Sequence, residues 1–219
     1  MKKVLFILTV IMLYLQLPAV AQKAKVGLEA GIAISNFSGN LNGKNTDYQS
    51  RTGLTAGMVV DMPIGKTNFS FRPSVNYVQK GAVTIETMNE KEYYALRYAE
   101  FAFNFLYHTS SKTGGVGFFI GLGPSVSLNL PSKSVVETGS TKVESNLILG
   151  NEGAAVLRGI DYGATGLAGV ELKKNCFLSF SYNYGLRNLI PDTKQVISPS
   201  DELKSRTFAI KVGFLLNNK

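Results

Sequence analysis

The chain has 219 residues, of which 45% are hydrophobic and 17% are charged. This length allows one large β domain or two small ones, and a lone cysteine, Cys176, excludes a fold held by internal disulfides. The formal net charge is +8, but the basic residues are scattered without a basic run, so we expect no nucleic-acid partner.

Residues 1–21 have the layout of a secretory signal peptide. Two lysines follow the initial methionine, the apolar run VLFILTVIMLYLQL comes next, and the small-x-small sequence AVA occupies 19–21. The alternative is a membrane-anchoring helix, but a helical span needs about 20 apolar residues, more than this run supplies. We therefore predict export and cleavage, which leaves residues 22–219 as one domain.

Beyond the signal, eight segments alternate between bulky apolar residues and small or polar residues. These candidate strands are residues 25–37, 50–62, 67–80, 93–108, 115–130, 158–173, 176–188 and 205–216. In the seventh, Leu178, Phe180 and Tyr182 alternate with serine and asparagine. Each segment is longer than the usual globular strand of about five or six residues and suits a tilted membrane-spanning strand of roughly 9–11 residues plus extensions.

The connections between these segments alternate strictly in length. The short ones are PIGKT, TSSKTG and KN, and the long ones are residues 38–49, 81–92, 131–157 and 189–204. In an up-and-down meander this places every long loop at one end, as in outer-membrane barrels with short periplasmic turns and longer external loops. We therefore predict an all-β fold, an eight-stranded antiparallel up-and-down transmembrane β-barrel with both termini in the periplasm.

The bulky residues of each strand should face lipid, and the small or charged residues should face the lumen. The predicted lumenal charge network consists of Glu29, Arg51, Asp61, Arg72, Lys80, Glu100, Asp161, Glu171, Arg187 and Lys211. Because both signs are present, we expect these side chains to pair and to fill the narrow interior of an eight-stranded barrel. Two alternatives stay open, a small channel and a soluble lipocalin-like barrel that buries its apolar residues around a ligand.

Five stretches resemble the PorT family of outer-membrane β-barrels, within the broader group of small OmpX-like barrels. They are VGLEAGIAISNFSG at 26–39, RYAEFAFNFLY at 97–107, FFIGLGPSVSLNL at 118–130, DYGATGLAGVEL at 161–172 and FSYNYGLRNL at 180–189. The matching positions are Gly27 and Gly31, Tyr98 and Glu100, Gly121, Gly123 and Pro124, and Asp161, Tyr162 and Gly163.

The chain departs from the family pattern at two places. Ala102 stands where relatives often have proline, and residues 215–219 follow the terminal aromatic Phe214. The family name is linked to a secretion pathway through its founding member, but most relatives have no assigned activity. The resemblance therefore implies the barrel fold and does not by itself imply a secretion role.

The sequence offers little catalytic or metal-binding chemistry. His108 is the only histidine, beside a short turn that contains Ser110 and Ser111, and it is far from Cys176 along the chain. A serine hydrolase needs a base next to its nucleophile, and a zinc site usually needs several nitrogen or sulfur ligands. We therefore expect His108 to be a polar turn residue, with no catalytic residue, no cofactor and no metal site.

These observations predict a non-enzymatic protein of the outer membrane that acts through its external loops, in a structural or interaction role that could include envelope assembly or secretion. The expected partners are outer-membrane lipids, the barrel-assembly machinery during insertion, and an unidentified envelope or extracellular protein, with the barrel itself monomeric. The longest loop, 131–157, is either a recognition surface or a mobile lid, since connections of this length are usually functional or disordered.

Overall fold

The computed structural model describes residues 24–41, 43–87, 90–109, 116–150, 155–172, 175–191 and 201–216. The predicted signal peptide and much of the predicted loop 189–204 lie outside this part of the chain. Within the described residues, no helix is both long enough and apolar enough to cross a membrane.

The described residues form a single antiparallel sheet. Its strands are β1 (Lys25–Leu41), β2 (Lys44–Asp47), β3 (Gln49–Pro63), β4 (Phe69–Glu86), β5 (Glu90–His108), β6 (Gly117–Thr138), β7 (Thr141–Leu147), β8 (Ile160–Glu171), β9 (Cys176–Gly185) and β10 (Glu202–Leu215). Neighbours follow the order β10-β9-β8-β6-β5-β4-β3-β1-β2, with β7 on β6.

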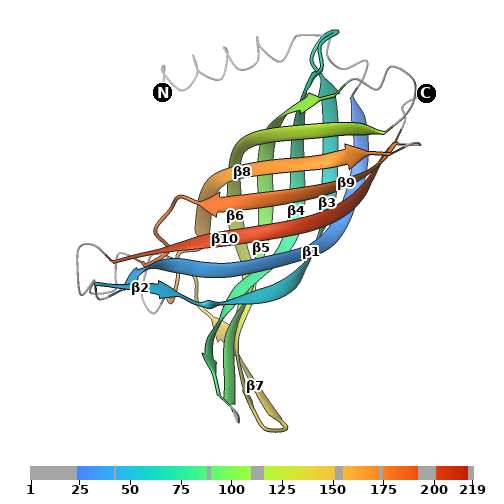
Figure 1. Cartoon of the computed structure of the whole chain (residues 1–219). Coiled ribbons are helices and arrows are strands. Elements are labelled where there is room, and N and C mark those ends of the chain that lie inside the picture. Colours follow the sequence, from blue (N-terminus) through green and yellow to red (C-terminus); the bar gives the residue numbers. More distant parts are fainter. Residues whose placement is uncertain are drawn as a thin grey trace, which may run out of the picture.

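The sheet closes on itself because β1 pairs with β10 as well as with β3 (Figure 1). The β1–β10 register runs from Gly27↔Leu215 to Asn40↔Glu202. Eight strands therefore form the ring, and β2 and β7 are additions to it. The predicted eight-stranded antiparallel barrel fold is confirmed.

The two ends of the barrel differ as the loop lengths predicted. The ends of the strands that short connections join, Pro63 and Phe69, His108 and Gly117, and Glu171 and Cys176, lie at one end, which we call the turn end. β1 starts and β10 finishes at the same end, since Gly27 pairs with Leu215. At the opposite end, the hairpin end, the β4–β5 and β6–β7 hairpins project beyond the barrel wall (Figure 1).

Three of the predicted loops are largely strand. β2 lies within 38–49 and β7 within 131–157, while β4 and β5 remain paired out to Glu86↔Lys91 and so convert the predicted loop 81–92 into a tight hairpin. The residues involved are rich in Val, Thr and Tyr, which favour strands. The alternation was lost at Gly81 because Gly81, Ala82 and Val83 are all buried and the register shifts just beyond them.

Large apolar side chains face outward. Leu122 is 73% exposed, Ile120 63% and Leu28 61%, whereas the polar side chains of Arg72 and Asn76 on the other face are only 3% exposed. Such a distribution is unfavourable in water and favourable in a bilayer. The lipocalin-like alternative, with apolar residues inside, is therefore wrong.

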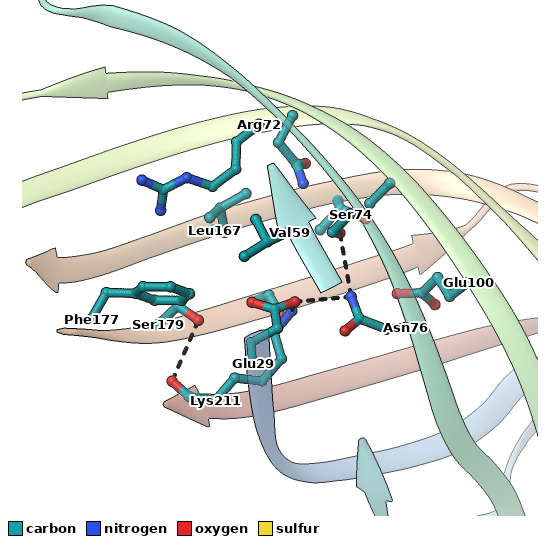
Figure 2. Close-up of a pocket in the computed structure, with 14 residues that line it drawn as sticks. Glu29, Val59, Arg72, Ser74, Asn76, Glu100, Leu167, Phe177, Ser179 and Lys211 are labelled. Carbon is teal, nitrogen blue, oxygen red and sulfur yellow. Dashed lines mark hydrogen bonds and ion pairs between the residues drawn. The ribbon is translucent and has the colours of Figure 1, made fainter. Parts of the chain in front are cut away.

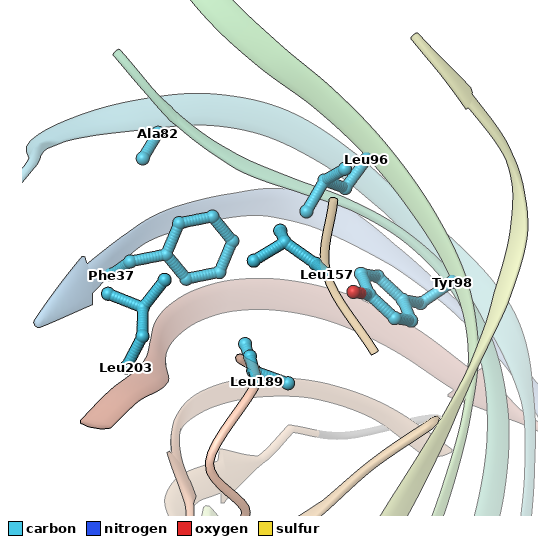
Figure 3. Close-up of a cluster of buried hydrophobic side chains, with 7 residues drawn as sticks. All are labelled: Phe37, Ala82, Leu96, Tyr98, Leu157, Leu189 and Leu203. Carbon is cyan, nitrogen blue, oxygen red and sulfur yellow. The ribbon is translucent and has the colours of Figure 1, made fainter. Parts of the chain in front are cut away.

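The interior also contains apolar clusters that the sequence analysis did not predict, two of them large and one a small group of Ala33, Val78 and Ala209. At the hairpin end, side chains from four strands and two loops converge inside the barrel (Figure 3). This cluster consists of Phe37, Ala82, Leu96, Tyr98, Leu157, Leu189 and Leu203. The second, towards the turn end, consists of Val59, Leu106, Phe119, Phe177 and Leu215. Polar side chains occupy the space between and around them.

Candidate functional site

The centre of the lumen is organised around Glu29 (Figure 2). Its Oε1 accepts a hydrogen bond from Asn76 Nδ2 at 2.9 Å and pairs with Lys211 Nζ at 2.5 Å. The three residues come from β1, β4 and β10, so the pair crosses the junction at which the barrel closes. A carboxylate buried to this extent needs such partners, because an isolated buried charge is costly.

A second ion pair joins β4 to β5. Lys80 Nζ lies 2.6 Å from Glu100 Oε2 and donates to Ser127 Oγ at 3.1 Å, and Ser127 Oγ in turn donates to Glu100. Lys80 is only 1% exposed, and its ammonium lies 5.3 Å from the centre of the Tyr98 ring. The pair is thus enclosed between the polar centre and the hairpin-end apolar cluster.

The remaining predicted lumenal residues of the hairpin half are more scattered. Asp161 is buried and Ser205 Oγ donates to its Oδ2 at 2.5 Å, while Asp161 Oδ1 lacks a hydrogen-bond partner among the described residues. Arg51 donates to the Lys80 carbonyl at 3.3 Å and stacks over Tyr93.

Arg187 lies beyond the end of its strand. β9 ends at Gly185, two residues earlier. The Arg187 guanidinium donates to the Ile160 carbonyl at 3.0 Å and packs over the ring of Tyr162, whose side chain is half exposed on the outer face. Once the strand has ended, alternation no longer fixes which side a residue faces.

At the turn end, five side chains form a closed ring of contacts. Asp61 Oδ1 accepts from Ser70 Oγ at 2.8 Å and from Arg72 Nε at 2.9 Å. Arg72 Nη2 donates to Glu171 Oε1 at 2.8 Å. His108 completes the ring, with Nε2 2.8 Å from Ser70 Oγ and Nδ1 3.4 Å from Glu171 Oε1.

The sequence analysis named three members of this turn-end ring and missed Ser70 and His108. His108 is the last residue of both the predicted strand 93–108 and β5. The sequence analysis interpreted it as a polar turn residue, whereas its side chain joins the lumenal ring. The signal was present, because His108 and Glu100 share the same parity along the strand and side chains alternate with period two. Ser70 likewise shares the parity of Arg72.

Ser70 contacts His108, and His108 contacts Glu171, as the nucleophile, base and orienting acid of a serine hydrolase contact one another. Ser70 is only 2% exposed, however, and its hydroxyl is shared between Asp61 and His108. A hydrolase must bring a substrate carbonyl to the nucleophile and to oxyanion donors at once. The buried hydroxyl leaves no room for such a substrate in this arrangement.

Little open space remains between the two apolar clusters. The central cavity measures about 30 Å³ and is lined by residues that include Glu29, Arg72, Asn76 and Glu100 (Figure 2). That volume holds one or two water molecules. Arg72 Nη1, Asn76 Oδ1 and Asn104 Oδ1 are buried without a protein partner among the described residues, so water in this cavity is their natural partner.

The projecting sheet at the hairpin end carries its own charges. Glu144 on β7 lies 2.6 Å from Lys133 Nζ and 3.1 Å from Lys142 Nζ, and hydrogen bonds from these two lysines lower the pKa of Glu144. Partial burial and a 3.0 Å hydrogen bond to Glu137 raise the pKa of Tyr93. These residues lie on the part of the sheet that projects beyond the barrel wall (Figure 1).

Comparisons with known proteins place the chain in a family. The family model described as outer membrane protein β-barrel domain matches residues 20–191. No curated protein sequence matches this chain.

Among solved structures, Ail of Yersinia pestis is 12% identical, with 89% of this chain and 100% of Ail covered and a TM-score of 0.43. The neisserial surface protein NspA is 15% identical, with 88% and 99% covered and a TM-score of 0.45. The outer membrane enzyme PagL is 13% identical, with 83% and 98% covered and a TM-score of 0.40. Similarity at this level carries no argument about activity. The family match spans most of the chain, and the protein therefore belongs to the family of outer membrane protein β-barrel domains.

Proposed function

We propose that this outer-membrane protein is a non-enzymatic barrel that binds a protein partner through the sheet projecting from its hairpin end. The observation that carries the proposal is the open edge of β7. Among the described residues β7 pairs only with β6, and six of its seven residues are exposed.

An open edge is chemically suited to binding an extended segment. Its free N–H and C=O groups can pair with an added strand, which supplies affinity through the main chain, and side chains next to the edge supply specificity. Unprotected edges also cause aggregation, and natural proteins limit this with charged residues. Lys142 and Glu144 provide such charges on β7 while leaving the exposed Val143 between them.

The partner is an extended segment of another envelope or extracellular protein. This requires the hairpin end to face outward and the turn end to face the periplasm, as in other outer-membrane barrels. Surrounding lipids cover the apolar wall, the barrel-assembly machinery inserts it, and the barrel acts as a monomer. We propose that the chain belongs to the PorT group of this family, and its resemblance to that group at Gly27, Gly31 and Glu100 supports the proposal.

A channel and an enzyme are the competing functions. A channel needs a continuous lumen, whereas here a central cavity of about 30 Å³ lies between two apolar clusters. A hydrolase of the serine type needs an accessible nucleophile, whereas Ser70 is buried. Neither observation favours these functions over binding at the projecting sheet.

Proline substitution on β7 tests the proposal sharply. Successive N–H groups of a strand point to opposite edges. Of the two variants Val143→Pro and Glu144→Pro, one therefore removes an N–H that pairs with β6, and the other removes an N–H from the open edge. We expect envelope proteins that photo-crosslink in intact cells to residue 145, which the shortened hairpin described next retains, to be lost in the variant that blocks the open edge. A shortened hairpin, with residues 136–143 replaced by Asn-Gly between the paired Val135 and Glu144, should also lose them.

The control is barrel insertion, monitored by the heat-dependent mobility of the folded protein on gels. The proline variant that interrupts the β6 ladder serves as the matched comparison for local damage. If the crosslinked proteins persist unchanged in the shortened hairpin while the barrel inserts normally, the projecting sheet is not the binding site and the proposal is wrong.

A further inference from the structure

We propose that Asp61, His108 and Glu171 form a binding site for a divalent transition-metal ion of the zinc type at the turn end of the lumen. The three residues belong to β3, β5 and β8, and one ligand atom from each lies within 4.8 Å of the others. A bound ion would tie three non-adjacent strands together. The site is at the opposite end from β7, so this proposal stands or falls independently of the proposed function.

The spacing of His108 and Glu171 fits two ligands of one metal ion. A charge-assisted hydrogen bond between nitrogen and a carboxylate is about 2.7–2.9 Å long, whereas His108 Nδ1 and Glu171 Oε1 are 3.4 Å apart. Two ligands held at about 2.1 Å from a tetrahedral zinc ion are separated by about 3.4 Å. The observed separation therefore matches that of two ligands on one ion.

The surrounding contacts would hold the ligands as the outer partners of metal sites do. Ser70 Oγ contacts His108 Nε2 at 2.8 Å, which fixes the ring and leaves Nδ1 to face the ion. Metal-binding histidines characteristically use the second ring nitrogen in this way. Arg72 holds both carboxylates in place through Asp61 Oδ1 and Glu171 Oε1.

Arg72 also competes with a metal ion, because it neutralises one of the two carboxylates. Two features allow both cations to be present. Glu171 Oε1 has a second lone pair, and Asp61 has a second oxygen, Oδ2, that Arg72 does not contact. In addition, the Arg72 guanidinium stacks on Phe119 and Phe177, with 4.8 Å and 5.3 Å to the ring centres, so it keeps other partners when an ion shares the carboxylates. One net negative charge remains for the metal.

The ligand set and its exposure identify the kind of ion and its route. One imidazole and two carboxylates suit zinc and similar ions, whereas calcium takes six to eight oxygen ligands. The His108 side chain is 19% exposed and that of Glu171 is 33% exposed, so an ion can enter from the aqueous compartment at the turn end. Three protein ligands leave a fourth position for water, as in open zinc sites.

The test measures Zn²⁺ binding to the folded, tag-free protein in detergent micelles by equilibrium dialysis. A polyhistidine tag must be absent, because His108 is the only histidine of the chain. We expect one equivalent of Zn²⁺ in the unmodified protein, with affinity at least tenfold weaker in His108→Gln and Glu171→Gln. The matched control is Glu144→Gln, an exposed carboxylate at the hairpin end that should bind zinc as the unmodified protein does.

A second measurement needs no variant and so does not depend on whether a substituted barrel folds. Diethyl pyrocarbonate modifies imidazole with a rise in absorbance near 240 nm, and a bound metal ion should slow the reaction of His108 at least tenfold. Zn²⁺ should also raise the unfolding temperature of the unmodified protein, since a ligand that binds only the folded state stabilises it. Equal zinc binding by His108→Gln and the unmodified protein, or an unchanged reaction of His108 in the presence of Zn²⁺, overturns the proposal.

Discussion

Replacing Glu29 with glutamine removes one charge from the central lumenal pair and leaves its shape almost unchanged. Lys211 then keeps a full positive charge in a site where its side chain is only 14% exposed, without the carboxylate 2.5 Å away. The hydrogen bond from Asn76 can persist, since the glutamine carbonyl still accepts. The loss of stability therefore reports the unpaired ammonium rather than a packing defect.

The magnitude follows from the distance and the burial. At 2.5 Å and an effective dielectric constant of about 20, the attraction between two unit charges is roughly 7 kcal/mol, much of which is offset by the desolvation of both groups. Breaking a buried pair on one side costs about 3–5 kcal/mol. Because Lys211 is partly exposed and borders the central cavity, we expect the lower value, about 3 kcal/mol.

The free energy of unfolding is measured by urea titration of the protein in phospholipid vesicles. Far-UV circular dichroism and gel mobility are the suitable signals, because the chain contains no tryptophan. The double variant Glu29→Gln, Lys211→Met should recover most of the loss, since replacing both members of a buried pair by uncharged residues is often neutral. The cycle then isolates a coupling energy of about 2 kcal/mol.

An exposed pair of similar length provides the control. Lys133 Nζ and Glu144 Oε2 are 2.6 Å apart, but both side chains are more than a third exposed. Glu144→Gln should therefore leave the urea midpoint almost unchanged, because exposed ion pairs contribute little to stability. Equal losses of unfolding free energy for Glu29→Gln and Glu144→Gln would refute the claim that burial makes the lumenal pair stabilising. An absence of coupling between Glu29 and Lys211 in the cycle would refute it as well.

Three further predictions concern the backbone, the lumen and the orientation. Gly81→Ala should lower the free energy of unfolding by more than about 1 kcal/mol, because the φ of Gly81 is +148° and an added Cβ would meet the Tyr94 carbonyl. Gly166→Ala, where an added Cβ meets open space, should be near neutral. Equal urea midpoints for the two variants would contradict this prediction. Planar-bilayer recordings should show little steady conductance, and large reproducible channels would favour a porin. In a Cys176→Ser background, an impermeable maleimide should label Glu144→Cys but not Lys66→Cys in intact cells, and the reverse pattern would invert the proposed orientation.

The sequence determined which side chains face out and which face in. The side chains of a strand alternate with period two, so a run such as Leu178, Phe180 and Tyr182 is assigned to one face without knowledge of its neighbours. The alternation of short and long connections distinguished the two ends of the barrel, since the length of each connection can also be seen without knowledge of its neighbours. The extension of β4 and β5 beyond the barrel was missed because the alternation of side chains is interrupted at Gly81. This glycine has a positive φ, and the three successive residues 81–83 are all buried.

The contacts across the lumen were decided only by the tertiary structure. Glu29 and Lys211 are 182 positions apart in the chain, and they meet because the β1–β10 register places Glu29 opposite Gly213. His108 reaches Glu171 across the intervening strand β6, and Leu157 and Leu189, which lie outside the strands, fill the hairpin end. Alternation tells on which face a residue lies, but register and strand tilt decide how far along the barrel it sits. The partner of each lumenal charge is therefore a property of the closed barrel and not of any one strand.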